Sequence, residues 1–89
     1  MATLAKMLAQ AVRNSLNLPN LNVTVRRNRT RGTWSFRLHK NGTSSEWLEL
    51  DAGAIEIMRQ LGLLPALHLG TFRVAYMELR RATEANESK

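Results

Sequence analysis

The sequence of 89 residues contains no cysteine, only two prolines and only five glycines. Without cysteine, disulfides, iron–sulfur clusters, thiolate zinc sites and cysteine nucleophiles are excluded. No apolar run approaches the roughly 20 residues that a membrane span requires. The first 16 residues lack the basic start, the unbroken apolar stretch and the small-residue cleavage site of a signal peptide. We therefore expect a cytoplasmic protein with no membrane partner.

Acidic residues are missing from one half of the chain. Residues 1–45 carry eight basic residues and no Asp or Glu, whereas residues 46–89 carry five basic and seven acidic residues. The net charge is +6, and most of the basic residues are arginine, whose planar guanidinium matches phosphates and base edges. This pattern favours a polyanionic partner, above all nucleic acid. The plain alternative is a basic surface that merely faces solvent.

The length predicts one domain over residues 1–85, followed by a disordered tail at 86–89. A chain of this size buries about two-thirds of its surface on folding, which is enough for one small core. Such a core leaves stability marginal. A homodimer through the apolar C-terminal half would add to that stability, so we keep it as an expectation.

Hydrophobic periodicity places the first elements. Apolar residues at three- and four-residue steps predict a helix over residues 3–15 that Thr3 caps. Strict alternation predicts strands over 21–26 and 33–40, and Asn41-Gly42 is a strong turn signal before a third strand over 45–50. These strands form an antiparallel sheet.

Burial decides the register of the third strand. A three-residue loop or an equivalent bulge pairs Phe36 with Leu48 and Trp34 with Leu50, which keeps both leucines on the core side. The same register sends Trp47 to the polar side opposite Arg37. A strict two-residue loop would place the leucines on the polar side, and we therefore reject it.

The C-terminal half predicts two helices. Asp51 is a good cap for a helix over 52–61, and Gly62 is a good stop. Residues 63–70 are expected to be a buried connection, and 71–85 a helix, although the start of that segment also alternates like a strand. A rival interpretation runs one helix over 45–60. The resulting fold class is α+β: an N-terminal helix, a three-stranded antiparallel sheet and two C-terminal helices. The expected core comprises Leu4, Leu8, Val12, Val23, Val25, Trp34, Phe36, Leu38, Leu48, Leu50, Ile55, Met58, Leu61, Phe72, Tyr76 and Leu79.

Catalytic signals are weak. His39 and His68 have no metal-type neighbour three or four residues away. No glycine-rich phosphate loop, nucleophile elbow or carboxylate pair occurs. We expect no enzymatic activity, no catalytic residue, no metal site and no cofactor.

The predicted hairpin of residues 21–40 carries the sharper signal. Six of its residues are basic and no acid interrupts them. A two-stranded ribbon fits the major groove of DNA, where arginine can bond guanine, while an exposed tryptophan can stack on a base. We therefore expect a small DNA-binding accessory or regulatory protein, with DNA favoured over RNA. The candidate binding residues are Thr24, Arg26, Arg27, Arg29, Arg31, Arg37, His39, Lys40 and Trp47.

Over residues 22–61 the strand order resembles the sheet-reading DNA-binding modules of plant transcription factors and integrase arm-binding domains. The resemblance rests on three strands followed by a helix and on Gly-Thr-Trp-Ser-Phe-Arg in the second strand. It implies that a sheet of this kind can read DNA. The helices at both ends depart from that pattern.

Two other interpretations stay open. Residues 54–61 and 71–85 could form a helix-turn-helix with Arg73, Arg80 and Arg81 on its second helix, although a nine-residue connection is long for that motif. The chain could instead be a small protein of the phage or mobile-element type that inhibits or adapts a larger host protein or nucleoprotein complex. Such a protein would dock on an acidic surface of its partner, because interface hot spots are rich in Trp and Arg.

Overall fold

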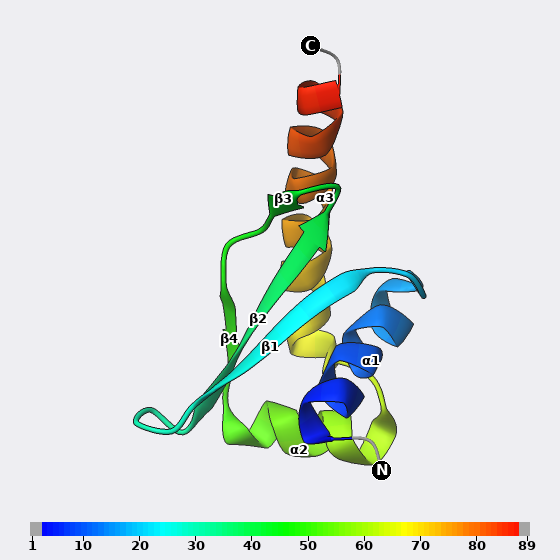
Figure 1. Ribbon diagram of the computed structural model, residues 1–89. Helices are drawn as coiled ribbons and strands as arrows, with labels where there is room; N and C mark the ends of the chain where they lie inside the picture. Colours follow the sequence, from blue (N-terminus) through cyan, green and yellow to red (C-terminus); the bar gives the residue numbers. More distant parts are fainter. Residues whose placement is uncertain (1–2, 88–89) are drawn as a thin grey trace.

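The structure is a computed structural model that describes residues 3–87. It confirms the α+β fold, with an N-terminal helix, an antiparallel sheet and two C-terminal helices (Figure 1). Its elements are α1 (Leu4–Leu16), β1 (Asn22–Asn28), β2 (Thr33–Lys40), β3 (Thr43–Ser44), β4 (Leu48–Leu50), α2 (Ala52–Leu61) and α3 (Ala66–Glu87). Within the described residues, no helix combines the length and the apolar character needed to cross a bilayer.

Local signals at both ends of α1 explain its bounds. The hydroxyl of Thr3 accepts a hydrogen bond from the backbone N–H of Lys6, as expected of a capping residue. Asn17 takes a left-handed conformation at φ 58° and ends the helix two residues before Pro19. The apolar side of α1 then packs against the sheet through Leu8, Val12 and their neighbours.

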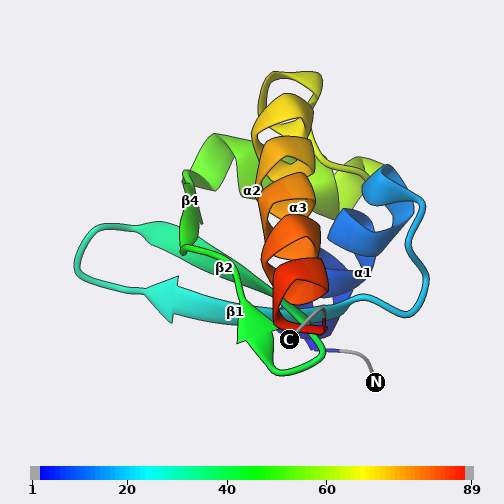
Figure 2. The same cartoon turned by 90° about the horizontal axis from the view of Figure 1, so that it is seen from above.

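The sheet is antiparallel and has β2 at its centre. β1 pairs with β2 along its whole length, with Val23 opposite Leu38 and Val25 opposite Phe36. Both β3 and β4 pair with the other edge of β2. The helices gather on one face of this sheet, and the other face of the β1–β2 hairpin is left uncovered (Figures 1 and 2).

The core lies between the sheet and the helices. Phe36 and Leu38 of β2 are fully buried, and the ring of Phe36 meets the ring of Phe72 from α3 edge to face at 5.7 Å between centroids. Leu8 and Val12 of α1 belong to the same cluster of buried side chains. Most of the predicted core is confirmed. Leu61 is the exception, because its side chain is 68% exposed at the end of α2.

The predicted third strand is divided into β3 and β4. Lys40 pairs with Thr43 and Phe36 with Leu48, so the two pairings differ in register by one residue. The turn itself is the two-residue Asn41-Gly42, and the bulge that we gave as the equivalent of a longer loop supplies the shift. Ser45 occupies the bulge, where its N–H donates to Leu38 O at 2.8 Å and its hydroxyl accepts from Leu38 N.

α2 begins and ends as predicted. The Asp51 carboxylate accepts a hydrogen bond from Ala54 N at 2.9 Å, and Gly62 ends the helix at φ +67°. A single helix over 45–60 is therefore wrong, because β4 pairs with β2 within that range.

α3 begins earlier than predicted. The expected connection over 63–70 is wrong for most of its length, because α3 starts at Ala66 directly after Pro65. Pro65 is compatible with the start of a helix, since the first turn needs no N–H from it. Leu67 is consequently exposed rather than buried. α3 also includes Asn86 and Glu87, which we expected in the tail, and residues 88–89 of that tail lie outside the described residues.

Candidate nucleic-acid interface

The β1–β2 hairpin extends beyond the helices that cover its base (Figures 1 and 2). Its tip, residues 28–33, turns through Gly32 at φ +66°, a conformation that glycine adopts without strain. The side-chain oxygen of Asn28 accepts a hydrogen bond from Arg31 N at 3.3 Å across the tip. The hairpin tip therefore presents its arginines to solvent on a turn that is ordered from within.

Alternation along the strands brings five predicted residues to the uncovered side of the sheet. Thr24 pairs with Arg37, Asn22 with His39, and Arg26 with Ser35, so side chains of one parity share one side. We call this surface the arginine face. It consists of Thr24, Arg26, Arg37, His39 and Trp47.

Trp47 is the centre of the arginine face. The Cζ atom of Arg26 lies 5.0 Å from the centroid of the Trp47 ring, and that of Arg37 lies 5.4 Å from it. Trp47 keeps 39% of its surface exposed. The bulge after β3 puts it there, because a residue inserted in the strand moves Trp47 off the core side and aligns Leu48 with Phe36. Packing of Trp47 in the core is thereby excluded.

Arg37 and Arg26 are held to different degrees. The Nε–H of Arg37 donates to the carbonyl of Ser45 at 2.8 Å, which ties the guanidinium to the bulge and leaves its terminal nitrogens for other acceptors. Arg26 is exposed, and its guanidinium lies over the Trp47 ring. A guanidinium stacked on a ring still directs its N–H groups outward in its own plane, where a phosphate or a base edge can accept from them.

His39 has a structural role that the sequence did not reveal. Its Nε2 lies 2.6 Å from the Thr24 hydroxyl and its Nδ1 lies 2.7 Å from the Ser44 hydroxyl. One ring nitrogen donates and the other accepts in the neutral ring, and the hydroxyls adapt to either arrangement. These contacts join β1, β2 and β3, so Thr24 and His39 have fewer groups to offer a ligand than the arginines do.

The remaining predicted residues lie outside the arginine face. Arg27 belongs to the opposite parity, and its Cζ lies 5.8 Å from the ring of Trp34. Arg29 and Arg31 are exposed in the hairpin tip. Lys40 is at the far end of β2, where its Nζ lies 5.9 Å from the ring of Tyr76. Eight of the nine residues therefore lie on one hairpin and Trp47 packs against it, but the nine do not share one surface.

A carboxylate also reaches the hairpin. Glu49 of β4 pairs in register with Ser35 and forms an ion pair with Arg31 at 3.4 Å. The side chain of Arg31 is nevertheless 67% exposed, so the pair is a surface one of small energy. The other two ion pairs within the described residues lie on the helices, and one of them, with Arg59, lowers the pKa of Glu56 through a hydrogen bond.

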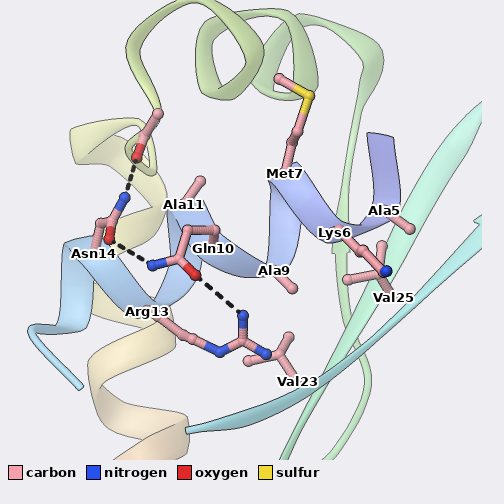
Figure 3. A pocket seen from close by; sticks show the side chains of 11 residues that line it. Ala5, Lys6, Met7, Ala9, Gln10, Ala11, Arg13, Asn14, Val23 and Val25 are labelled. Carbon is pink, nitrogen blue, oxygen red and sulfur yellow. Dashed lines mark hydrogen bonds between the residues drawn. The ribbon is translucent and has the colours of Figure 1, made fainter. Parts of the chain in front are cut away.

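Two of the hollows that adjoin the hairpin differ in character. One, of about 490 Å³, is lined by Arg26, Arg27, Asn28, Arg29, Ser35 and Trp47, and so joins the arginine face to the tip. The other, of about 730 Å³, lies beside α1 and β1 (Figure 3). The side chains of Gln10, Arg13 and Asn14 in its lining bond to one another or to the backbone, as when Arg13 Nε donates to Leu21 O at 2.6 Å. Among the described residues, its lining includes no carboxylate or histidine.

This chain matches no protein-family model, no curated protein and no solved structure.

The helix-turn-helix interpretation changes in one respect. Only residues 62–65 separate α2 from α3, so the nine-residue connection on which we ranked it low is wrong. Arg73, Arg80 and Arg81 are exposed on α3, but Leu67, Val74 and Met77 are exposed on the same helix. Residues 46–89 also carry more acidic than basic residues, which is unfavourable for binding a polyanion. The hairpin remains the better candidate.

Proposed function

We propose that this protein binds nucleic acid, with DNA favoured over RNA, through the arginine face and the hairpin tip. One observation carries the proposal: two guanidinium groups, of Arg26 and Arg37, lie over the exposed ring of Trp47 on a hairpin side that none of the described helices covers. Because both guanidinium groups already pack on the Trp47 ring, the two side chains lose less conformational freedom when they bind a ligand.

The chemistry of these groups suits phosphates and base edges. Arginine donates to phosphate oxygens and, in the major groove, to O6 and N7 of guanine. A ribbon of two strands fits that groove in DNA, whereas the major groove of an RNA helix is too deep and narrow for side chains to read. Trp47 adds a ring on which an unpaired base can stack.

The hairpin tip extends the positive surface. Arg29 is exposed and has no carboxylate partner within the described residues, and Arg31 shares its charge with Glu49. We expect Arg29 to contact a phosphate and Arg31 to contribute less. This ranking distinguishes arginines that are equivalent in the sequence.

The test is the salt dependence of binding to a mixed-sequence DNA duplex, measured by fluorescence anisotropy at several salt concentrations. Four phosphate contacts would give a slope of log K against log salt of about −3.6. The double variant Arg26→Ala/Arg29→Ala should weaken binding and reduce the magnitude of that slope by about 1.8. A single strand and an RNA duplex, measured in parallel, show which nucleic acid is preferred.

The matched control is Arg59→Ala/Arg80→Ala. Both residues are exposed arginines on helices, so this variant removes the same formal charge away from the hairpin. It should leave the slope close to that of the parent chain. Equal losses in the two double variants would show a diffuse charge effect and contradict the proposed surface. Absence of binding to any nucleic acid at low salt would overturn the function and favour a protein partner with an acidic surface.

A further inference from the structure

α3 is apolar on two sides. Its inner side, with Phe72, Leu79 and Thr83, is buried against the sheet and α1. Its outer side carries Leu67, Gly70, Val74 and Met77, at successive steps of three, four and three residues. The exposed fractions on that side are 85% for Leu67, 58% for Val74 and 46% for Met77. We call these four residues the outer stripe.

The spacing of the outer stripe is that of a coiled-coil seam. Steps of three and four alternate in a heptad, where the first and fourth positions of each repeat face a partner helix. Leu67 and Val74 occupy one of these positions, and Gly70 and Met77 occupy the other. The small Gly70 lets a second backbone approach closely, since a Cβ added there would meet nothing within 4 Å.

We infer that the outer stripe binds the outer stripe of a second copy of this chain, with the two α3 helices parallel. This inference does not rest on the proposed function. The stripe lies opposite the buried residues Phe72 and Leu79 on α3, with Val74 at the edge of a hollow that Ser45 and Leu48 also line. The arginine face lies on the other side of the sheet. Two copies joined in this way therefore keep both arginine faces open.

Charge complementarity selects a second copy in the parallel direction. Arg73 and Glu78 flank the stripe on opposite sides and are five residues apart, which is the spacing of pairs between parallel helices in a dimer. No ion pair within the described residues involves either of them. A parallel dimer joins each Arg73 to the Glu78 of the other copy. An antiparallel one brings Arg73 near Arg73 and Glu78 near Glu78.

The two ends of α3 support the same direction. Leu61 and Leu63, which precede the helix, are 68% and 46% exposed and lie at the end where Leu67 is. The far end carries Arg80, Arg81 and Glu84 and rises past the end of β2 (Figure 1). Parallel helices bring the leucine-rich ends together, whereas antiparallel helices would set leucines against charges. The contact then ends near Glu78, and the last turns diverge.

Sedimentation velocity over a range of protein concentrations tests the association. The parent chain should shift from monomer to dimer as concentration rises, and Val74→Glu should remain a monomer. Because Val74 is exposed, circular dichroism should show the same fold in this variant. A parent chain that stays monomeric at every concentration overturns the inference.

Charge reversal and cross-linking test the direction. Arg73→Glu and Glu78→Arg should each weaken the dimer, and the double variant should restore it. Since the sequence has no cysteine, Leu67→Cys introduces a single thiol that should form a disulfide between parallel copies. Gln10→Cys, exposed on α1, is the control and should not. Failure of Leu67→Cys to cross-link in a dimer that does form would contradict the parallel pairing of the outer stripes.

Discussion

At the scale of single residues, the arginines of the hairpin are equivalent in the sequence and different in the structure. Arg26 lies over a ring and is exposed, Arg37 also donates to Ser45 O, and Arg31 is paired with Glu49. From the sequence alone, all three are candidate binding residues of one predicted hairpin. The register of β1 with β2 and the path of β4 decide which of them can meet a ligand together.

Trp47 provides a probe of the proposed function. In Trp34→Phe, the only remaining tryptophan is Trp47, and we expect its fluorescence to fall when nucleic acid is added, because a base stacks on it or Arg26 and Arg37 move away from it. In Trp47→Phe, the remaining Trp34 should change little. A larger change in Trp47→Phe than in Trp34→Phe would place the contact near Trp34 and contradict the assignment of the arginine face.

At the scale of elements, local sequence signals explain which helices were predicted closely. Tertiary contacts explain the element that the sequence did not resolve. α1 and α2 were predicted closely, because Thr3 and Asp51 cap them and Asn17 and Gly62 end them within a few residues of sequence. The start of α3 was missed because a proline can either break a helix or precede its first turn, and Pro65 does the latter. The division of the third strand depends on Ser45, whose bonds to Leu38 exist only after the strands pair.

Replacing Gly62, at the end of α2, and Gly70, inside α3, by alanine should change the free energy of unfolding in opposite directions. Gly62→Ala places an alanine at φ +67°, and we expect it to lower the free energy of unfolding by about 1 kcal/mol. Gly70→Ala lies inside α3 with nothing within 4 Å of an added Cβ, so it should raise that free energy by about 0.5–1 kcal/mol.

Urea denaturation of both alanine variants beside the parent chain measures these changes, at a protein concentration low enough to keep all three monomeric. Changes of the same sign would contradict the left-handed helix end at Gly62 or the helical position of Gly70. Asp51→Ala is a useful reference, because loss of a helix cap has a known cost of about 1 kcal/mol.

At the scale of the whole molecule, one small core supports both surfaces. The contact between Phe36 and Phe72 connects the hairpin, which carries the arginine face, to α3, which carries the outer stripe. Phe72 is only 1% exposed. The layers are therefore arranged as arginine face, sheet, core, α3 and outer stripe, with the two proposed binding surfaces, one polar and one apolar, at opposite sides.

Phe72→Ala should cost about 3–5 kcal/mol, because it leaves a cavity in the centre of this core. That is a large part of the 5–15 kcal/mol that typically stabilises a domain, so nucleic-acid binding and dimerisation should be lost together as the chain unfolds. Phe72→Leu retains most of the volume and should cost less. Thermal and urea unfolding measure both. A cost below about 1 kcal/mol for Phe72→Ala would contradict the central role of this contact.

The sequence by itself determined the α+β class, the ends of α1 and α2, the pairing of Phe36 with Leu48 and the exposure of Trp47. These follow from hydrophobic periodicity, capping residues and the rule that a one-residue slip reverses the sides of a strand. Only the tertiary structure decided that Glu49 reaches Arg31, that His39 joins three strands, and that α3 has an exposed apolar side. Such outcomes depend on which distant segments meet, and periodicity within one segment carries no information about its neighbours.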